Sequence, residues 1–388
     1  INSANMIIPK KFDDIRTWEE DDLPEAYNRL LSNEQFKSVL AYLYPDVPFD
    51  AVAKKMRSCR NGHEFQLAFS YDFIGNILKK VSTGCEMDSE KIDNTKRYTF
   101  VSNHRDIVLD SGILDKLLVD AKFTTTCEIA IGDNLLSLPW IKDVVSVNKS
   151  FIVERGLPMR QMLMSSKRLS EYMHFAVSEK HENIWIAQRE GRAKDSNDHT
   201  QEALLKMMTM GGTGSIVDRL KSLHIVPLSI SYEYDSCDFL KAREFQLKRD
   251  VEGWKKEPQD DIVSMQTGLI GHKGHVHYQC AECIDDFLDT IGEDVPKTDF
   301  YRMVAEHIDK GIFNGYMLYP GNYVALDLLN GSSEFAGKFY TPEQKAKFET
   351  YISGQLAKIE LPNKDEDFLR ERMLTMYANP LRNYLSVR

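Results

Sequence analysis

Between residues 96 and 285, short apolar runs alternate with helix-like segments, and this alternation constrains the fold more than any other feature of the sequence. The apolar runs are RYTFVSN (97–103), TTTCEIAIG (124–132), KSFIVER (149–155), NIWIAQ (183–188), IVPLSISYEY (225–234) and HVHYQC (275–280). Alternation of this kind predicts an α/β fold with a mixed, largely parallel sheet flanked by helices. In such sheets function is concentrated beyond the carboxyl ends of the strands, so the chemically informative residues are expected there.

The sequence on both sides of this region is predicted to be helical. The segment NEQFKSVLAYLYP (33–45) places apolar residues at helical spacing and ends in a proline. After residue 286 the segments TDFYRMVAEHIDKGI and TPEQKAKFETYISGQLAKI show the same periodicity. We therefore predict an N-terminal helical region (1–95), an α/β domain (96–285) and a C-terminal helical region (286–388).

Charge and cysteine content narrow the functional classes. The formal net charge of -10 argues against nucleic acid as a partner. The six cysteines lack the spacing of a disulfide framework and are predicted to be reduced thiols of a cytoplasmic protein. We expect no signal peptide, and no run reaches the roughly 18–20 apolar residues of a membrane-spanning helix.

The first candidate catalytic segment is NHRDIVLD (103–110), which follows a strand-like run. A histidine can take a proton from a hydroxyl, and a carboxylate can orient it and raise its basicity. His104 has two candidate partners in this segment, Asp106 and Asp110. The alternative interpretation is a polar turn that caps a helix.

Two later strand ends carry cations. KSFIVERG (149–156) places Arg155 at the end of a strand, and the planar guanidinium fork suits phosphate. A second cationic segment, QREGRAKD (188–195), holds the candidate binding residues Glu190, Gly191, Arg192 and Lys194. Exposed charged loops are the alternative for both segments.

Other motifs favour direct group transfer. No G-x-S-x-G nucleophile elbow occurs, so an acyl-serine intermediate is not expected. The segment GHKGHVHYQCAEC (271–283) contains three histidines and a Cys-x-x-Cys, which suggests zinc, but its histidines alternate with apolar residues as in a strand. We predict no metal site.

Taken in order, NHRDIVLD, KSFIVERG, QREGRAKD and IVPLSI resemble the four blocks of the glycerolipid acyltransferase superfamily, the glycerol-3-phosphate and 1-acylglycerol-3-phosphate acyltransferases. The long flanks are similar to those of a bacterial subgroup. Two features depart from the pattern. Five residues instead of four separate His104 from Asp110, and the third block lacks the usual threonine after Glu190-Gly191. We favour Asp110 as the partner, because a turn can absorb one extra residue, and Asp106 stays open.

The resemblance implies a mechanism. His104 would deprotonate an acceptor hydroxyl that attacks the thioester of acyl-CoA or acyl-carrier protein, and Asp110 would orient the histidine. Arg155 and Arg192, with Lys194 as a further candidate, would bind the acceptor phosphate, while Glu190 would hold their loop in place. The resemblance implies no metal or redox cofactor.

The implied acceptors belong to phospholipid biosynthesis at a membrane surface. We therefore expect peripheral association with the inner face of the membrane. The segment MRQMLMSSKRL (159–169) is one candidate for the contact, although packing in the core is the favoured alternative for it. Two other functions stay open: acyl transfer to a different lyso-lipid such as an aminolipid, and non-catalytic binding of lipid or carrier protein.

Overall fold

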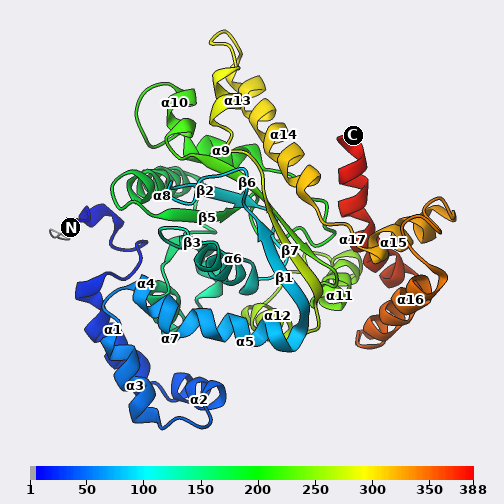
Figure 1. The fold of residues 1–388 in the computed structure, drawn as a ribbon, viewed down its shortest axis with the longest axis horizontal. Coiled ribbons are helices and arrows are strands. Elements are labelled where there is room, and N and C mark those ends of the chain that lie inside the picture. Colours follow the sequence, from blue (N-terminus) through cyan, green and yellow to red (C-terminus); the bar gives the residue numbers. More distant parts are fainter. Residues whose placement is uncertain (1–5) are drawn as a thin grey trace.

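The computed structural model describes residues 6–388, and its centre is a seven-stranded sheet with the order β1-β7-β6-β2-β5-β3-β4 (Figure 1). The strands are β1 (Ser82–Asp88), β2 (Thr99–Ser102), β3 (Cys127–Gly132), β4 (Ser150–Val153), β5 (Asn183–Ala187), β6 (Ile225–Tyr232) and β7 (Gly274–Cys280). Strands β6 and β7 pair antiparallel, and every other neighbouring pair is parallel. The predicted mixed, largely parallel α/β fold is confirmed.

All six apolar runs form strands, but the sequence did not predict β1, which lies inside the region expected to be helical. Its sequence, STGCEMD, contains few large apolar residues, and the strand is only half-buried at the edge of the sheet. An edge strand needs little apolar surface, so its periodicity was too weak to detect. The division into three regions stays a prediction, and residues 1–5 of the first region lie outside the described residues.

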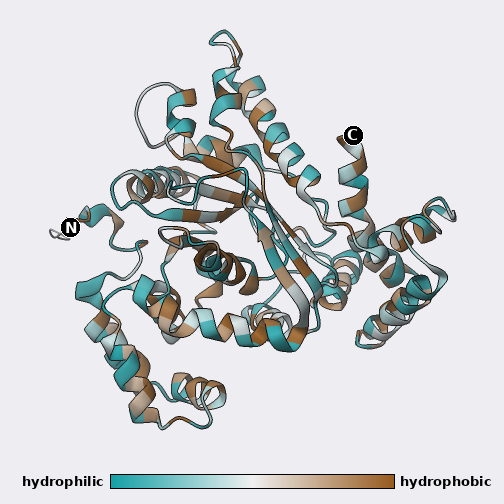
Figure 2. Cartoon of the chain, in the orientation of Figure 1, coloured by the Kyte–Doolittle hydropathy of each residue, from teal (hydrophilic) through white to brown (hydrophobic). Residues whose placement is uncertain are grey.

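Helices cover both faces of the sheet. The helices of the central region are α5 (Tyr71–Val81), α6 (Leu109–Asp120), α7 (Pro139–Val147), α8 (Met159–Ser178), α9 (Glu202–Met208), α10 (Ile216–Lys221), α11 (Asp238–Asp250), α12 (Pro258–Ile270), α13 (Asp285–Asp289) and α14 (Lys297–Gly315). Successive residues of a strand point to opposite faces. Phe100 of β2 packs in a core with α5 and α6, and Val101 packs in a second core with α8 and α14. Figure 2 shows the apolar colouring concentrated in these central elements.

Helices near the two ends of the chain form two smaller cores. At the N-terminal side these are α1 (Leu23–Ser32), α2 (Glu34–Leu43), α3 (Phe49–Ser58), α4 (Gly62–Phe65) and the π-helical turn η3 (Gln66–Ser70). At the C-terminal side they are α15 (Pro320–Asn330), α16 (Pro342–Ala357) and α17 (Glu366–Ser386). Among residues 6–388, no helix is long and apolar enough to span a membrane.

Candidate active site

The structure joins His104 to Asp110. His104 follows the carboxyl end of β2, and its Nδ1 lies 2.6 Å from Oδ2 of Asp110, the second residue of α6. The Asp110 side chain is fully buried, whereas 13% of the His104 side chain is exposed. The pair therefore has a shielded carboxylate behind an imidazole that reaches solvent.

Four donors surround the Asp110 carboxylate. Oδ2 also accepts hydrogen bonds from the backbone N–H groups of Arg105 (2.6 Å) and Asp106 (3.1 Å), and Oδ1 accepts one from the hydroxyl of Tyr232 (2.8 Å). Burial alone would raise the pKa of Asp110, but the bonds from His104, Arg105 and Tyr232 outweigh it and hold the pKa below its usual value. Asp110 is therefore ionised at neutral pH and faces the imidazole as a carboxylate.

The extra residue between His104 and Asp110 lies in the turn that wraps around this carboxylate. Asp106 has a different role, because its Oδ1 accepts from the backbone N–H groups of Val108 (3.1 Å) and Leu109 (2.9 Å) and so caps the start of α6. Burial raises the pKa of Asp106, and the charge of Lys273 opposes the rise. The geometry thus assigns the imidazole to Asp110 and the helix cap to Asp106.

Neighbouring strands fix the histidine. The side chain of Asn103 bonds both backbone groups of Ile230 in β6, donating to its carbonyl (2.9 Å) and accepting from its N–H (2.8 Å). The Trp185 ring of β5 packs against the imidazole at 5.2 Å with an interplanar angle of 70°. These contacts leave the His104 ring little freedom to turn away from Asp110.

The predicted phosphate-binding residues lie beyond the ends of β4 and β5. Nη1 of Arg155 lies 3.5 Å from Oε1 of Glu190, whose side chain is largely exposed. Glu190 thereby links the loop after β5 to the loop after β4. Within residues 6–388, Nε of Arg155 and Nη1 of Arg192 are buried without a hydrogen-bond partner. Buried donors are almost always paired, and both residues line the cavity described below, so both donors are available to a ligand there. Gly191 has a φ of +71°, a conformation that suits glycine and turns the chain here.

Lys194 is less available than the sequence suggested. Its Nζ lies 2.5 Å from Glu244 of α11, fifty residues further along the chain. Burial lowers the pKa of Lys194 to about 8, and the carboxylate of Glu244 opposes this effect. Lys149, which precedes β4, lies at the other edge of the sheet and pairs with Glu182 (2.6 Å).

One structural pair was missed by sequence reasoning. Arg105, next to His104, makes a bidentate ion pair with Asp198 (2.7 and 2.6 Å), and the hydroxyl of Tyr316 also bonds Asp198. All three side chains are buried. The pair fastens the loop after β5 to the catalytic turn, and its partners are too far apart in sequence to be recognised.

A cavity of about 1530 Å³ brings the site together. Its lining includes all the predicted residues except the two aspartates: His104, Arg155, Glu190, Gly191, Arg192 and Lys194. A second part of its wall is apolar and comes from α2, α4, η3 and α7, through Phe36, Leu40, Phe65, Phe69, Trp140 and Val144. The cavity therefore combines a proton acceptor, cations and an apolar arm.

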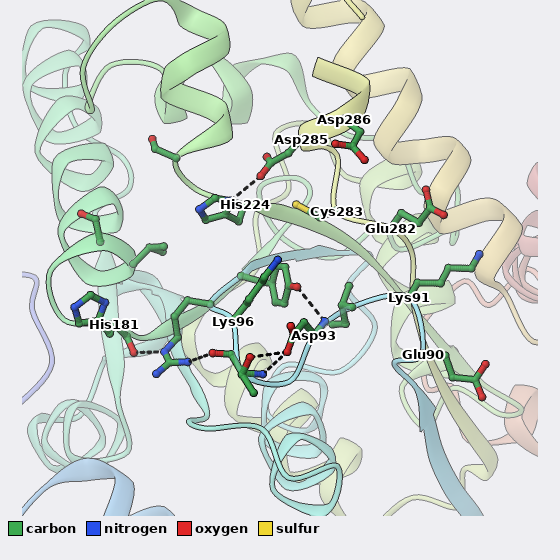
Figure 3. A pocket seen from close by; sticks show the side chains of 17 residues that line it. Glu90, Lys91, Asp93, Lys96, His181, His224, Glu282, Cys283, Asp285 and Asp286 are labelled. Atoms are coloured by element: carbon green, nitrogen blue, oxygen red, sulfur yellow. Dashed lines mark hydrogen bonds and ion pairs between the residues drawn. The ribbon is translucent and has the colours of Figure 1, made fainter. Parts of the chain in front are cut away.

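In the structure, the histidines and the last cysteine of the segment that suggested zinc lie in two different places. His275 and His277 of β7 both bond Glu86 of β1, at 2.9 and 3.0 Å. A second cavity, of about 980 Å³, lies at the amino ends of β2 and β6 and shows His224 bonded to Asp285 with Cys283 beside them (Figure 3). Potential metal-binding atoms of these three residues lie within 4.8 Å of one another, on the opposite edge of the sheet from His104.

Residues 86–231 match the model of the family described as Acyltransferase. This stretch contains β2 to β5, all but the last residue of β6 and every candidate site residue, so the central α/β unit includes an acyltransferase domain. The predicted acyltransferase domain is thus confirmed for this part of the chain.

A crystal structure of the 1-acyl-sn-glycerophosphate (LPA) acyltransferase PlsC from Thermotoga maritima is also similar, with 12% sequence identity and a TM-score of 0.36. The match covers 76% of this chain and 95% of that chain. No curated protein matches the chain.

Proposed function

We propose that this enzyme moves a fatty acyl group from acyl-CoA or acyl-carrier protein to a hydroxyl of glycerol-3-phosphate or 1-acylglycerol-3-phosphate. The observation that carries the proposal is the cavity itself. It joins the His104–Asp110 pair to the unpaired guanidinium donors of Arg155 and Arg192 and to an apolar arm. A base, an anion site and an apolar wall are what a phosphorylated acceptor and a fatty acyl donor require.

The chemistry follows from the tautomer that Asp110 imposes. Because Nδ1 of His104 is engaged by Asp110, Nε2 is left to take the proton of the acceptor hydroxyl. The oxygen attacks the thioester carbon, the tetrahedral intermediate expels the thiolate, and His104 returns the proton to sulfur. The buried carboxylate stabilises the imidazolium between these steps. In this proposal the histidine and aspartate handle every proton, and no metal or redox cofactor takes part.

The acyl chain is proposed to lie in the apolar arm. Phe36 and Leu40 of α2 and Phe69 of η3 approach the cavity from the N-terminal helices, and Trp140 and Val144 of α7 lie on the same wall. Burying an alkyl chain against such side chains contributes about 0.8 kcal/mol per methylene. The N-terminal helices would therefore hold the donor chain while His104 meets the thioester.

An acceptor panel tests the function. Purified enzyme should acylate glycerol-3-phosphate or 1-acylglycerol-3-phosphate and should leave an uncharged monoacylglycerol nearly untouched. Arg192→Ala should raise KM for the phosphate acceptor by roughly 10- to 100-fold, because a hydrogen bond to a charged group contributes about 1.5–3 kcal/mol. Activity confined to acceptors without phosphate would contradict the proposal.

One observation favours the second candidate, a lyso-lipid with an amino group as acceptor. Glu244 pairs with Lys194, and Glu190 lies beside Arg155, so carboxylates accompany two of the three predicted cations. The same acceptor panel, extended to a lyso-aminolipid, separates the two candidates. The non-catalytic alternative is disfavoured, because the stretch that matches the acyltransferase model retains the His104–Asp110 pair.

The pKa of Lys194 gives a pH dependence. Since burial lowers this pKa to about 8, the amine loses its charge as the pH rises through that value. Binding of a phosphate favours the protonated amine, so KM for the phosphate acceptor should rise between pH 7 and pH 9. Lys194→Arg stays charged throughout this range and should flatten the profile. Identical KM profiles for the two proteins would exclude Lys194 from acceptor binding.

We further propose that the enzyme works in the cytoplasm, associated peripherally with the inner face of the membrane. The proposed lysolipid acceptor and its product are amphipathic and partition into bilayers. An apolar or basic surface next to the cavity would support such an association.

A further inference from the structure

The first two turns of α8 expose large apolar side chains. Met159, Leu163 and Met164 are 83%, 59% and 69% exposed. Single exposed apolar residues are normal on a protein surface, but three within six residues of one helix are a patch. The favoured expectation that this segment packs in the core is therefore wrong for these three residues.

Cations share the same arc of the helix. With about 100° of rotation per residue, Met159, Leu163, Lys167, Arg160 and Met164 fall within roughly 140° of one another. Arg160 and Lys167 are exposed, and in the part of the chain that the structure describes neither has an ion-pair partner. Apolar residues interleaved with unpaired cations suit an anionic lipid surface, where the apolar groups enter and the cations meet headgroups.

The opposite arc of the same turns belongs to the catalytic cavity. Met162, Ser165, Ser166 and Leu169 line it, together with Arg155 just before the helix. The N-terminal part of α8 is thus a wall with the cavity on one side and the exposed patch on the other. A bilayer that contacts the patch would lie within one helix diameter of the site, about 10–12 Å with side chains.

We propose that the α8 patch, formed by Met159, Arg160, Leu163, Met164 and Lys167, docks the enzyme on an anionic bilayer and holds the cavity at the lipid surface. The inference rests on the proposed function for its purpose, since it explains how a lipid acceptor reaches His104. The docking itself depends only on the exposed residues. The proposed occupant of the patch is a membrane, and failure of the wild-type protein to bind anionic vesicles would instead favour a protein partner.

The test is co-sedimentation of the full chain with vesicles of phosphatidylcholine, with and without phosphatidylglycerol. Wild type should bind the anionic vesicles and release them as salt is raised. Leu163→Asp/Met164→Asp should weaken binding at least tenfold, and Arg160→Gln/Lys167→Gln should weaken it by about fivefold per charge removed. Leu385→Asp, an exposed apolar residue on α17, and Lys338→Gln/Lys347→Gln, two exposed cations, are the matched controls and should bind as wild type does.

Activity separates the two proposals. The α8 variants should lose turnover of acceptor embedded in vesicles and keep turnover of a short-chain, water-soluble acceptor. If no acceptor is acylated while vesicle binding still depends on the α8 patch, the docking proposal stands and the proposed function fails. The docking proposal is overturned if wild type ignores anionic vesicles, if the α8 variants bind as wild type does, or if the controls lose binding equally. The charge variant alters only exposed side chains, so it decides the question if the aspartate variant does not fold.

Discussion

Replacing His104 with alanine should lower kcat by about 10²–10⁴-fold, the usual contribution of a general base. The imidazole is the group that meets both the buried Asp110 carboxylate and the cavity. KM for the acceptor should change little, because the guanidinium groups of Arg155 and Arg192 are untouched. Steady-state kinetics with the best acceptor of the panel would measure both constants.

Thermal unfolding is the control that shows whether the His104→Ala protein is folded. His104 is partly exposed and packs on Trp185 at its edge, so its loss should leave the thermal unfolding transition nearly in place. His104→Gln keeps a polar side chain of similar size without a titratable ring and should be as inactive. Turnover unchanged in a folded His104→Ala protein would refute the assignment of the base.

The second large effect concerns the two aspartates. Asp110→Asn should reduce kcat by about 10²–10⁴-fold, because a neutral amide no longer stabilises the imidazolium that forms during the reaction. Asp106→Asn should reduce kcat less than tenfold. Its carboxyl caps α6, so its loss affects stability, by about 1 kcal/mol.

The two variants are matched in size, charge change and location, and both alter buried side chains four residues apart. Thermal melts would show the cost to folding, and kcat would show the cost to catalysis. A larger loss of kcat in Asp106→Asn than in Asp110→Asn would contradict the pairing that the structure shows. A pH profile of kcat for each variant would also show whether the pH at which activity changes has moved.

The sequence predicted the parts of the site that follow a strand directly. His104, Arg155 and Arg192 each lie just beyond the end of an apolar run, and the parallel sheet brings these ends to one edge. The sequence favoured Asp110 over Asp106 but left Asp106 open, because the choice depends on how the turn wraps around one carboxylate. That decision required the positions of the backbone N–H groups of Arg105 and Asp106.

Contacts between distant segments were not predictable either. Glu244 lies fifty residues after the lysine it pairs with, and Asp198 lies ninety-three residues after Arg105. The apolar arm is another example, since α2 and η3 appeared in the sequence only as amphipathic helices. Local pattern shows that such helices have an apolar face, but tertiary packing decides what that face encloses.

The hydrogen bonds that α14 and the residue after it make with the loop after β5 decide where this chain can be truncated. Asp309 accepts hydrogen bonds from both the backbone and the hydroxyl of Thr200, and Tyr316 closes the ion pair between Arg105 and Asp198. A fragment that stops before α14 keeps every motif, yet it removes the Tyr316 contact from the buried Arg105–Asp198 pair and uncovers the part of one sheet face that α14 covers. The smallest unit that can be expressed as a working enzyme is therefore set by the packing of α14, and it extends beyond the segment that carries the sequence motifs.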